Sequence, residues 1–193
     1  MHRFAKLFLL IPVIGLLLPA AARAAEPRKG ILSDLVADSS YLTVAGARFR
    51  NYDAGPIGWG GRAGIYSPSP WQDIDWGFEG TYDHSNRTAP RFKRTDYSSG
   101  VYLRWWAFGQ DRRGYEIATP YLFGGVSAQH VNVDAILDNV AVRHSGWRPA
   151  ARAGAGARFG PFQFDAWFNY VQHWSDYSPS TWGTSLGVVL PLK

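Results

Sequence analysis

The 193-residue sequence contains no cysteine, which excludes a disulfide framework and any metal site built from thiolates. Beyond Leu18 it has no apolar run approaching the roughly eighteen residues of a transmembrane helix. It carries no phosphate-binding loop, dinucleotide fingerprint or paired-carboxylate site in a convincing context. We therefore expect no cofactor and no metal, and the informative residues are the abundant aromatics and glycines.

The N-terminus has the three parts of a secretory signal peptide. A basic start is followed by the apolar run Leu7–Leu18 and by a small-residue cleavage site at Ala22–Ala24. An N-terminal membrane helix is disfavoured, because the apolar run is too short to span a bilayer and is interrupted by Pro12. We predict a cleaved signal peptide at 1–24, a short periplasmic segment at 25–39 and one β-domain at 40–193.

The charge of the exported chain is nearly balanced. Cleavage removes Arg3, Lys6 and Arg23 from the 20 basic residues and none of the 15 acidic residues, so the net charge falls from +5 to about +2. Such a weak imbalance does not indicate a nucleic-acid partner. The 9 Trp, 10 Tyr, 11 Phe and 21 Gly, without a long helical apolar run, are instead typical of an all-β membrane protein.

The segment Asp73–Asp83 shows the clearest local pattern. Its side chains alternate between an apolar set (Ile74, Trp76, Phe78, Gly80, Tyr82) and a polar or small set (Asp73, Asp75, Gly77, Glu79, Thr81, Asp83). A period of two indicates a β-strand with two different faces. About ten residues is also the length of a tilted strand that crosses a bilayer.

The same alternation recurs in seven further segments: 41–50, 58–66, 96–107, 121–133, 147–159, 164–175 and 181–192. The faces are less cleanly separated in 121–133. Eight is an even number and the smallest size usual for barrels of the outer membrane. The sequence therefore predicts an all-β fold, an eight-stranded antiparallel transmembrane β-barrel.

The predicted connections alternate in length. Tight or polar turns are expected at 67–70, 110–116 and 160–162, and longer links at 51–57, 85–94, 134–145 and 176–180. Short periplasmic turns and longer external loops are the usual asymmetry of such barrels.

Alternation alone does not decide which face is outside, and a soluble barrel of the lipocalin kind would turn its apolar face inward. Two features favour an apolar face toward lipid and a charged lumen. Aromatic residues gather near strand ends as in an interfacial girdle, at Trp59, Tyr82, Tyr97, Trp147, Trp174 and Trp182. The opposite face carries both signs of charge, so Arg48, Arg62, Arg104, Arg152 and Arg158 are expected to pair with Asp75, Glu79, Asp96 and Asp165.

With these strands, turns and signal, the chain resembles the small outer-membrane barrels of the OmpA/OmpX type. The resemblance rests on the pattern over nearly all of the exported chain. It implies a Gram-negative outer membrane, closure of the barrel by the first and last strands, and recognition by the barrel-assembly machinery during biogenesis. Its partners would be outer-membrane lipid and lipopolysaccharide, and we expect a monomer.

The sharpest catalytic candidate is the pair His173 and Ser175, which would share one face of a strand, so that the imidazole could activate the hydroxyl. The segment Gln172–Asp176 resembles the His-x-Ser motif of PagL-type lipid A 3-O-deacylases. The resemblance implies an active site formed by His173, Ser175 and a Glu on the last strand. The last strand here has Trp182 and Thr184 and no Glu, and the alternation places His173 and Ser175 in the lumen. A deacylase is therefore the runner-up.

A basic cluster in the second external link is the candidate lipopolysaccharide site. It comprises Arg87, Arg91, Lys93 and Arg94, and guanidinium and ammonium groups pair well with phosphates. His84, His130, His144 and His173 show no close spacing typical of metal ligands. The best hypothesis is a non-enzymatic barrel in envelope integrity, lipopolysaccharide interaction or surface contact; a narrow pore is the further alternative, disfavoured by Tyr102, Trp106 and Trp167 on the lumen face.

Overall fold

The computed structural model describes residues 40–52, 55–69, 73–107 and 118–192. The predicted signal peptide, the segment 25–39 and the turn at 110–116 lie outside these described residues. Within the described ranges, no helix is long and apolar enough to cross a membrane.

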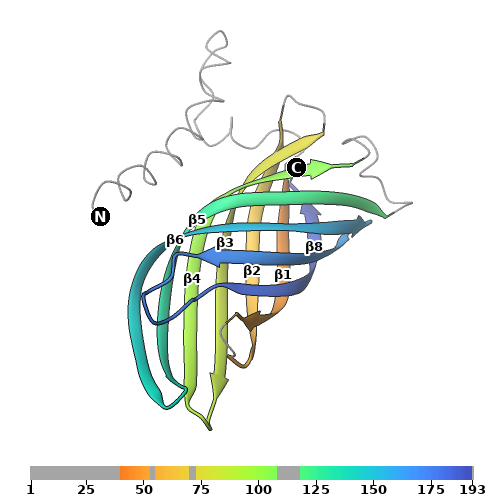
Figure 1. The fold of residues 1–193 in the computed structure, drawn as a ribbon. Helices are drawn as coiled ribbons and strands as arrows, with labels where there is room; N and C mark the ends of the chain where they lie inside the picture. The colour runs from red at the N-terminus through yellow and green to blue at the C-terminus, as the bar shows by residue number, and fades with distance from the viewer. Residues whose placement is uncertain (1–39, 53–54, 70–72, 108–117, 193) are drawn as a thin grey trace, which may run out of the picture.

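Eight strands form one closed antiparallel barrel, as predicted (Figure 1). They are β1 (Tyr41–Asn51), β2 (Ile57–Pro68), β3 (Ile74–Arg87), β4 (Phe92–Trp106), β5 (Thr119–Leu137), β6 (Val140–Phe159), β7 (Phe162–Val171) and β8 (Thr181–Pro191). Each strand pairs with its neighbour in sequence, and β1 pairs with β8, from Tyr41 opposite Pro191 to Asn51 opposite Thr181. Closure leaves no unpaired sheet edge where all eight strands lie side by side.

The strands differ greatly in length. β5 and β6 contain 19 and 20 residues, whereas β7 contains 10 and β1 contains 11. The β3–β4 and β5–β6 hairpins therefore project beyond the rest of the barrel at one end, the lower end in Figure 1. At about 3.3 Å per residue, the projecting part of β6 beyond β7 is about 30 Å long, measured along the strand.

The expectation of long loops at 85–94 and 134–145 is wrong. Pairing continues through both segments, to Arg87 opposite Phe92 and Leu137 opposite Val140. The reason is that inward positions of the projecting strands are apolar: Phe92, Val133, Ala135 and Val142 form a buried cluster with Tyr177. The β5–β6 link is the two-residue turn Asp138–Asn139, with φ of 49° and 65°. Two positive φ values are those of a type I′ turn, whose twist suits a hairpin.

The predicted facing is confirmed on β2, β3, β4, β6, β7 and β8 and is wrong on β1, while for 121–133 in β5 the sequence predicted no clear separation of faces. On β3, Asp75, Glu79 and Asp83 are buried, while Phe78 on the opposite face is exposed. On β1 the inward residues are Tyr41, Thr43, Ala45, Ala47 and Phe49, and Arg48 is exposed on the outer face. The reason is that the inward residues have partners inside the barrel. The Tyr41 hydroxyl donates to Asp75 at 2.6 Å, and Phe49 packs with Trp167.

Aromatic side chains encircle part of the outer face. Trp59, Tyr82 and Tyr97 lie on adjacent strands, with ring centroids 5.8 Å apart for the first pair and 5.3 Å for the second. Trp147 and Trp182 are also outward and exposed. Trp174 was expected in this girdle, but it lies in the β7–β8 link and packs half-buried against the inner clusters.

Candidate functional site

Buried ion pairs cross the middle of the barrel. Arg62 of β2 donates to Asp165 of β7 at 2.5 Å and lies 3.9 Å from Glu79 of β3. Arg152 of β6 reaches the same Glu79 oxygen at 2.6 Å. These residues come from four strands, so the network ties opposite walls of the barrel together. Since an unpaired buried charge costs several kcal/mol, each carboxylate here requires its arginine.

Arg104 has a different environment from the one expected. Its guanidinium lies over the rings of Tyr66 and Tyr121, at 4.2 and 4.5 Å from their centroids, and donates to the Tyr41 hydroxyl at 3.2 Å. Asp75 accepts from Tyr41 and from the Trp106 indole at 2.7 Å. These rings belong to a buried cluster of Tyr41, Tyr66, Tyr102, Trp106, Tyr121 and Val189 at the end with the short turns. The cation is held by ring faces and by the Tyr41 hydroxyl rather than by a carboxylate.

The end with the projecting hairpins is covered by the β7–β8 link, residues 172–180. Tyr177 is 2% exposed among the inward residues of the hairpins. Arg94, which is 1% exposed, bonds to Asp96 at 2.8 Å, to the Asn51 amide oxygen at 2.5 Å and to the Pro179 carbonyl at 2.6 Å. Described side chains thus pack both ends of the barrel, which argues against the narrow pore.

The structure separates the four residues of the basic cluster. Arg94 is buried in the inner network, so it is not available to an external phosphate. The sequence could have indicated this, because Arg94 and Asp96 are two residues apart and so share one face of a strand. Arg87 donates to the Pro90 carbonyl at 3.3 Å, and Arg91 pairs with Asp134. Arg91, in the β3–β4 turn, and Lys93, on the outer face of β4, are both exposed. Arg91, Asn132 and Asp134 line a shallow surface pocket of about 410 Å³, together with Val133, Arg143, His144 and Ser145.

His173 and Ser175 do not lie in the lumen. β7 ends at Val171, so both residues fall in the exposed β7–β8 link. The expectation was wrong because the chain leaves the strand to cover the barrel end. Among the described residues neither side chain has a hydrogen-bond partner, and Asp176 pairs instead with His144 at 2.8 Å. The elements of a nucleophile, an oriented base and a carboxylate are not assembled here.

The other histidines have separate aromatic partners. His84 contacts Trp59, His130 contacts Trp147, and His144 stacks on Trp174 with ring centroids 4.6 Å apart. Across the described ranges, no group of three or more metal-ligating side chains comes together.

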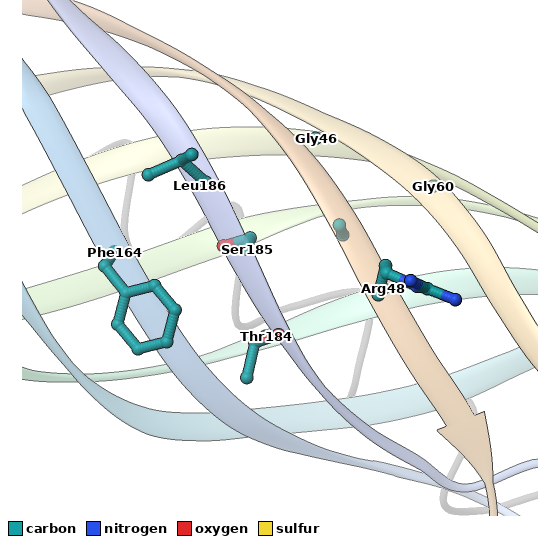
Figure 2. A pocket seen from close by; sticks show the side chains of 8 residues that line it. Gly46, Arg48, Gly60, Phe164, Thr184, Ser185 and Leu186 are labelled. Carbon is teal, nitrogen blue, oxygen red and sulfur yellow. The ribbon is translucent and has the colours of Figure 1, made fainter.

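A depression of about 390 Å³ on the outer surface was not predicted from the sequence (Figure 2). Its lining includes Gly46 and Arg48 of β1 and Leu186 of β8, together with Ala47, Gly60, Phe164, Thr184 and Ser185. In Figure 2, Phe164, Leu186 and Thr184 lie on one side and Arg48 on the other. In the sequence, Arg48 and the small Gly46 alternate on one face of β1. That face is recognised as the outer one only once β1 is assigned its correct orientation.

No family model matches the chain, and no curated protein matches it by sequence. Two solved structures share its architecture. Neisserial surface protein A is 17% identical, covers 79% of this chain and 96% of its own length, and gives a TM-score of 0.52. The outer membrane enzyme PagL is 14% identical, covers 78% of this chain and 99% of its own length, and gives a TM-score of 0.54.

The chain has the fold of the small eight-stranded outer-membrane barrels. At these identities the likeness concerns the fold alone, since one such fold carries both a surface protein and an enzyme. Activity therefore depends on the residues of this chain itself.

Proposed function

We propose that this chain is a non-enzymatic integral protein of the Gram-negative outer membrane, exported by a cleaved signal peptide, that acts in envelope integrity, lipopolysaccharide interaction or surface contact. The observation that carries the proposal is the inverted distribution of side chains. Leu103, Phe78 and Leu186 are 54, 56 and 64% exposed, whereas Arg62, Glu79 and Asp165 are almost completely buried. An outer face this apolar is costly in water and favourable in lipid.

Closure of the barrel supports the same conclusion. Every strand has two antiparallel neighbours, so backbone donors and acceptors along the wall are satisfied without water. The outward Trp59, Tyr82 and Tyr97 have the apolar body and polar tip that suit a membrane interface.

Membrane fractionation and heat-modifiable gel migration test the proposal. We expect the protein in the outer-membrane fraction and a folded band that shifts in mobility after boiling in detergent. Recovery in the soluble periplasmic fraction, without detergent, would contradict it. The expected monomer is tested by crosslinking in the same membranes.

We assign lipopolysaccharide contact to the exposed basic residues beside the projecting hairpins. Arg87, Arg91 and Lys93 lie on or near the β3–β4 turn and its outer face. Phosphate oxygens are natural acceptors for these groups. A variant with all three replaced by Gln is expected to bind lipopolysaccharide more weakly in vesicles, with unchanged migration on gels; unchanged binding would refute this assignment.

A further inference from the structure

The depression beside Arg48 lies where β8, β1 and β2 adjoin on the outer face. The register places Phe164 opposite Leu186, Leu186 opposite Gly46, and Gly46 opposite Gly61. Two large apolar residues are thus followed along one row by two glycines. A Cβ built at Gly46 would meet nothing within 4 Å, and one at Gly61 would meet only a carbonyl oxygen at 3.9 Å. The surface is therefore open at this point, with room for an extended hydrocarbon chain.

A positive charge lies at one end of this depression. Arg48 follows Gly46 by two residues on the same face of β1, and its register partners are Thr184 on β8 and Trp59 on β2. Arg48 is exposed and has no acidic or hydrogen-bonding partner among the described residues. The next outward residue, Arg50, has none either. Cations within an apolar outer face are stabilised by an anion from outside the chain.

These two observations complement each other. A trough with apolar walls beside an unpaired guanidinium matches a molecule with an acyl chain and a phosphate. Arg48 can form two parallel hydrogen bonds to phosphate oxygens, and the hydroxyl of Thr184 on the neighbouring strand offers a further donor. Arg48 and Arg50 lie near the end of β1, close to Asn51. Arg94, at the end of the barrel with the projecting hairpins, donates a hydrogen bond to Asn51, so both cations lie toward that end.

We propose that this depression binds lipid A of lipopolysaccharide, with one acyl chain lying over Gly46 and Gly61 and a phosphate on Arg48. The inference rests on the proposed function, because it needs the outer face in lipid and the projecting hairpins outside the cell. With the projecting hairpins outside the cell, Arg48 lies at the level of the outer leaflet, where lipid A is the phosphorylated lipid. We therefore choose lipid A as the ligand. It is distinct from the contact assigned to Arg87, Arg91 and Lys93, which lie on the projecting hairpins.

Binding is measured with the exported chain folded into phosphatidylcholine nanodiscs and titrated with fluorescent lipid A, dephosphorylated lipid A or phosphatidylglycerol. We expect the tightest binding to intact lipid A. Equal binding of the dephosphorylated form would overturn the role of phosphate, and equal binding of phosphatidylglycerol would overturn the choice of lipid A.

Matched variants separate the two parts of the site. Arg48→Gln is expected to weaken lipid A binding about tenfold, the loss of one charge-assisted contact, and Arg48→Lys to retain most of it. Gly46→Leu fills the depression and is expected to weaken binding by a similar factor. Gly80→Leu is its control, since Gly80 is outward on β3 and its Cβ would meet only a carbonyl oxygen at 3.7 Å.

The outcomes distinguish failure of the lipid A site from failure of the proposed function. If every variant shows heat-modifiable migration and enters nanodiscs, but Arg48→Gln and Gly46→Leu bind lipid A as the parent does, the lipid A site is refuted and the membrane barrel stands. If the parent itself does not enter nanodiscs, the proposed function fails and this site fails with it.

Discussion

Arg94 of β4 donates a hydrogen bond to the carbonyl oxygen of Pro179 at 2.6 Å, although the two residues are 85 positions apart in the sequence. The same guanidinium bonds to Asp96 and to Asn51 of β1. One buried side chain therefore connects the link that covers the barrel end to two strands of its wall. A link held in this way is part of the folded core rather than a free loop.

Replacing Arg94 by Met should destabilise the barrel by about 3 kcal/mol, because Asp96 would stay buried without its charge partner. Chymotrypsin should also cleave the link at 172–180 sooner, after Trp174 or Tyr177. Unfolding in urea and timed proteolysis measure the two effects. Arg91→Met is the control: its pair with Asp134 is largely exposed and is worth less than about 1 kcal/mol. Equal stability of the two variants would contradict the structural role of Arg94.

Leu103→Arg distinguishes a lipid environment from water at the outer face. Leu103 is exposed and outward on β4, so in water the change should have little effect, within about 0.5 kcal/mol. In a bilayer we expect a loss of roughly 2–4 kcal/mol. Asn132→Arg on the projecting part of β5 is the control, with little loss expected. Urea unfolding in phosphatidylcholine vesicles gives both values, and an unaffected Leu103→Arg variant would count against membrane embedding.

His173→Ala and Ser175→Ala should leave lipid A unchanged, because neither side chain has a described catalytic partner. Mass spectrometry of lipid A from cells with the parent, the variants or no protein provides the measurement. The same 3-O-acylated species are expected in every sample. Loss of that acyl chain with the parent, and its return with either variant, would establish the deacylase instead.

Asn139→Val should destabilise the β5–β6 hairpin by about 1–2 kcal/mol, since a β-branched side chain is strained at φ 65°. Asn139→Gly should be neutral or slightly stabilising, because glycine adopts this conformation without strain. Amide exchange of the projecting strands reports the local effect. Equal exchange in the two variants would show that the turn does not determine hairpin stability.

Some of the architecture was accessible from local pattern. The alternation at Asp73–Asp83 and its repeats predicted eight strands and the facing of every strand from β2 to β8 except β5, because successive side chains on a strand must point to opposite sides. β1 was misassigned because Arg48 looked like an interior charge. Its apolar residues, Ala45, Ala47 and Phe49, in fact pack inside.

The candidate site was less accessible. Arg94 stood in a basic run that looked like one external surface, yet alternation within a continuing strand sends it inward while Lys93 points outward. His173 and Ser175 were assigned by extending the alternation past Val171, where the strand stops. The second error could not be corrected from local sequence, since the end of a strand depends on whether a partner strand remains beside it.

Taken alone, the sequence determined the number of strands, their antiparallel succession and their two unlike faces, because these follow from a period of two and from turn residues. Only the tertiary structure decided how far each strand extends, which carboxylate each arginine meets, and that Gly46, Arg48 and Leu186 border one depression on the outer face. The reason is physical. Strand register and barrel closure bring together residues that are distant in the chain, and the local sequence pattern does not specify which distant residues become neighbours.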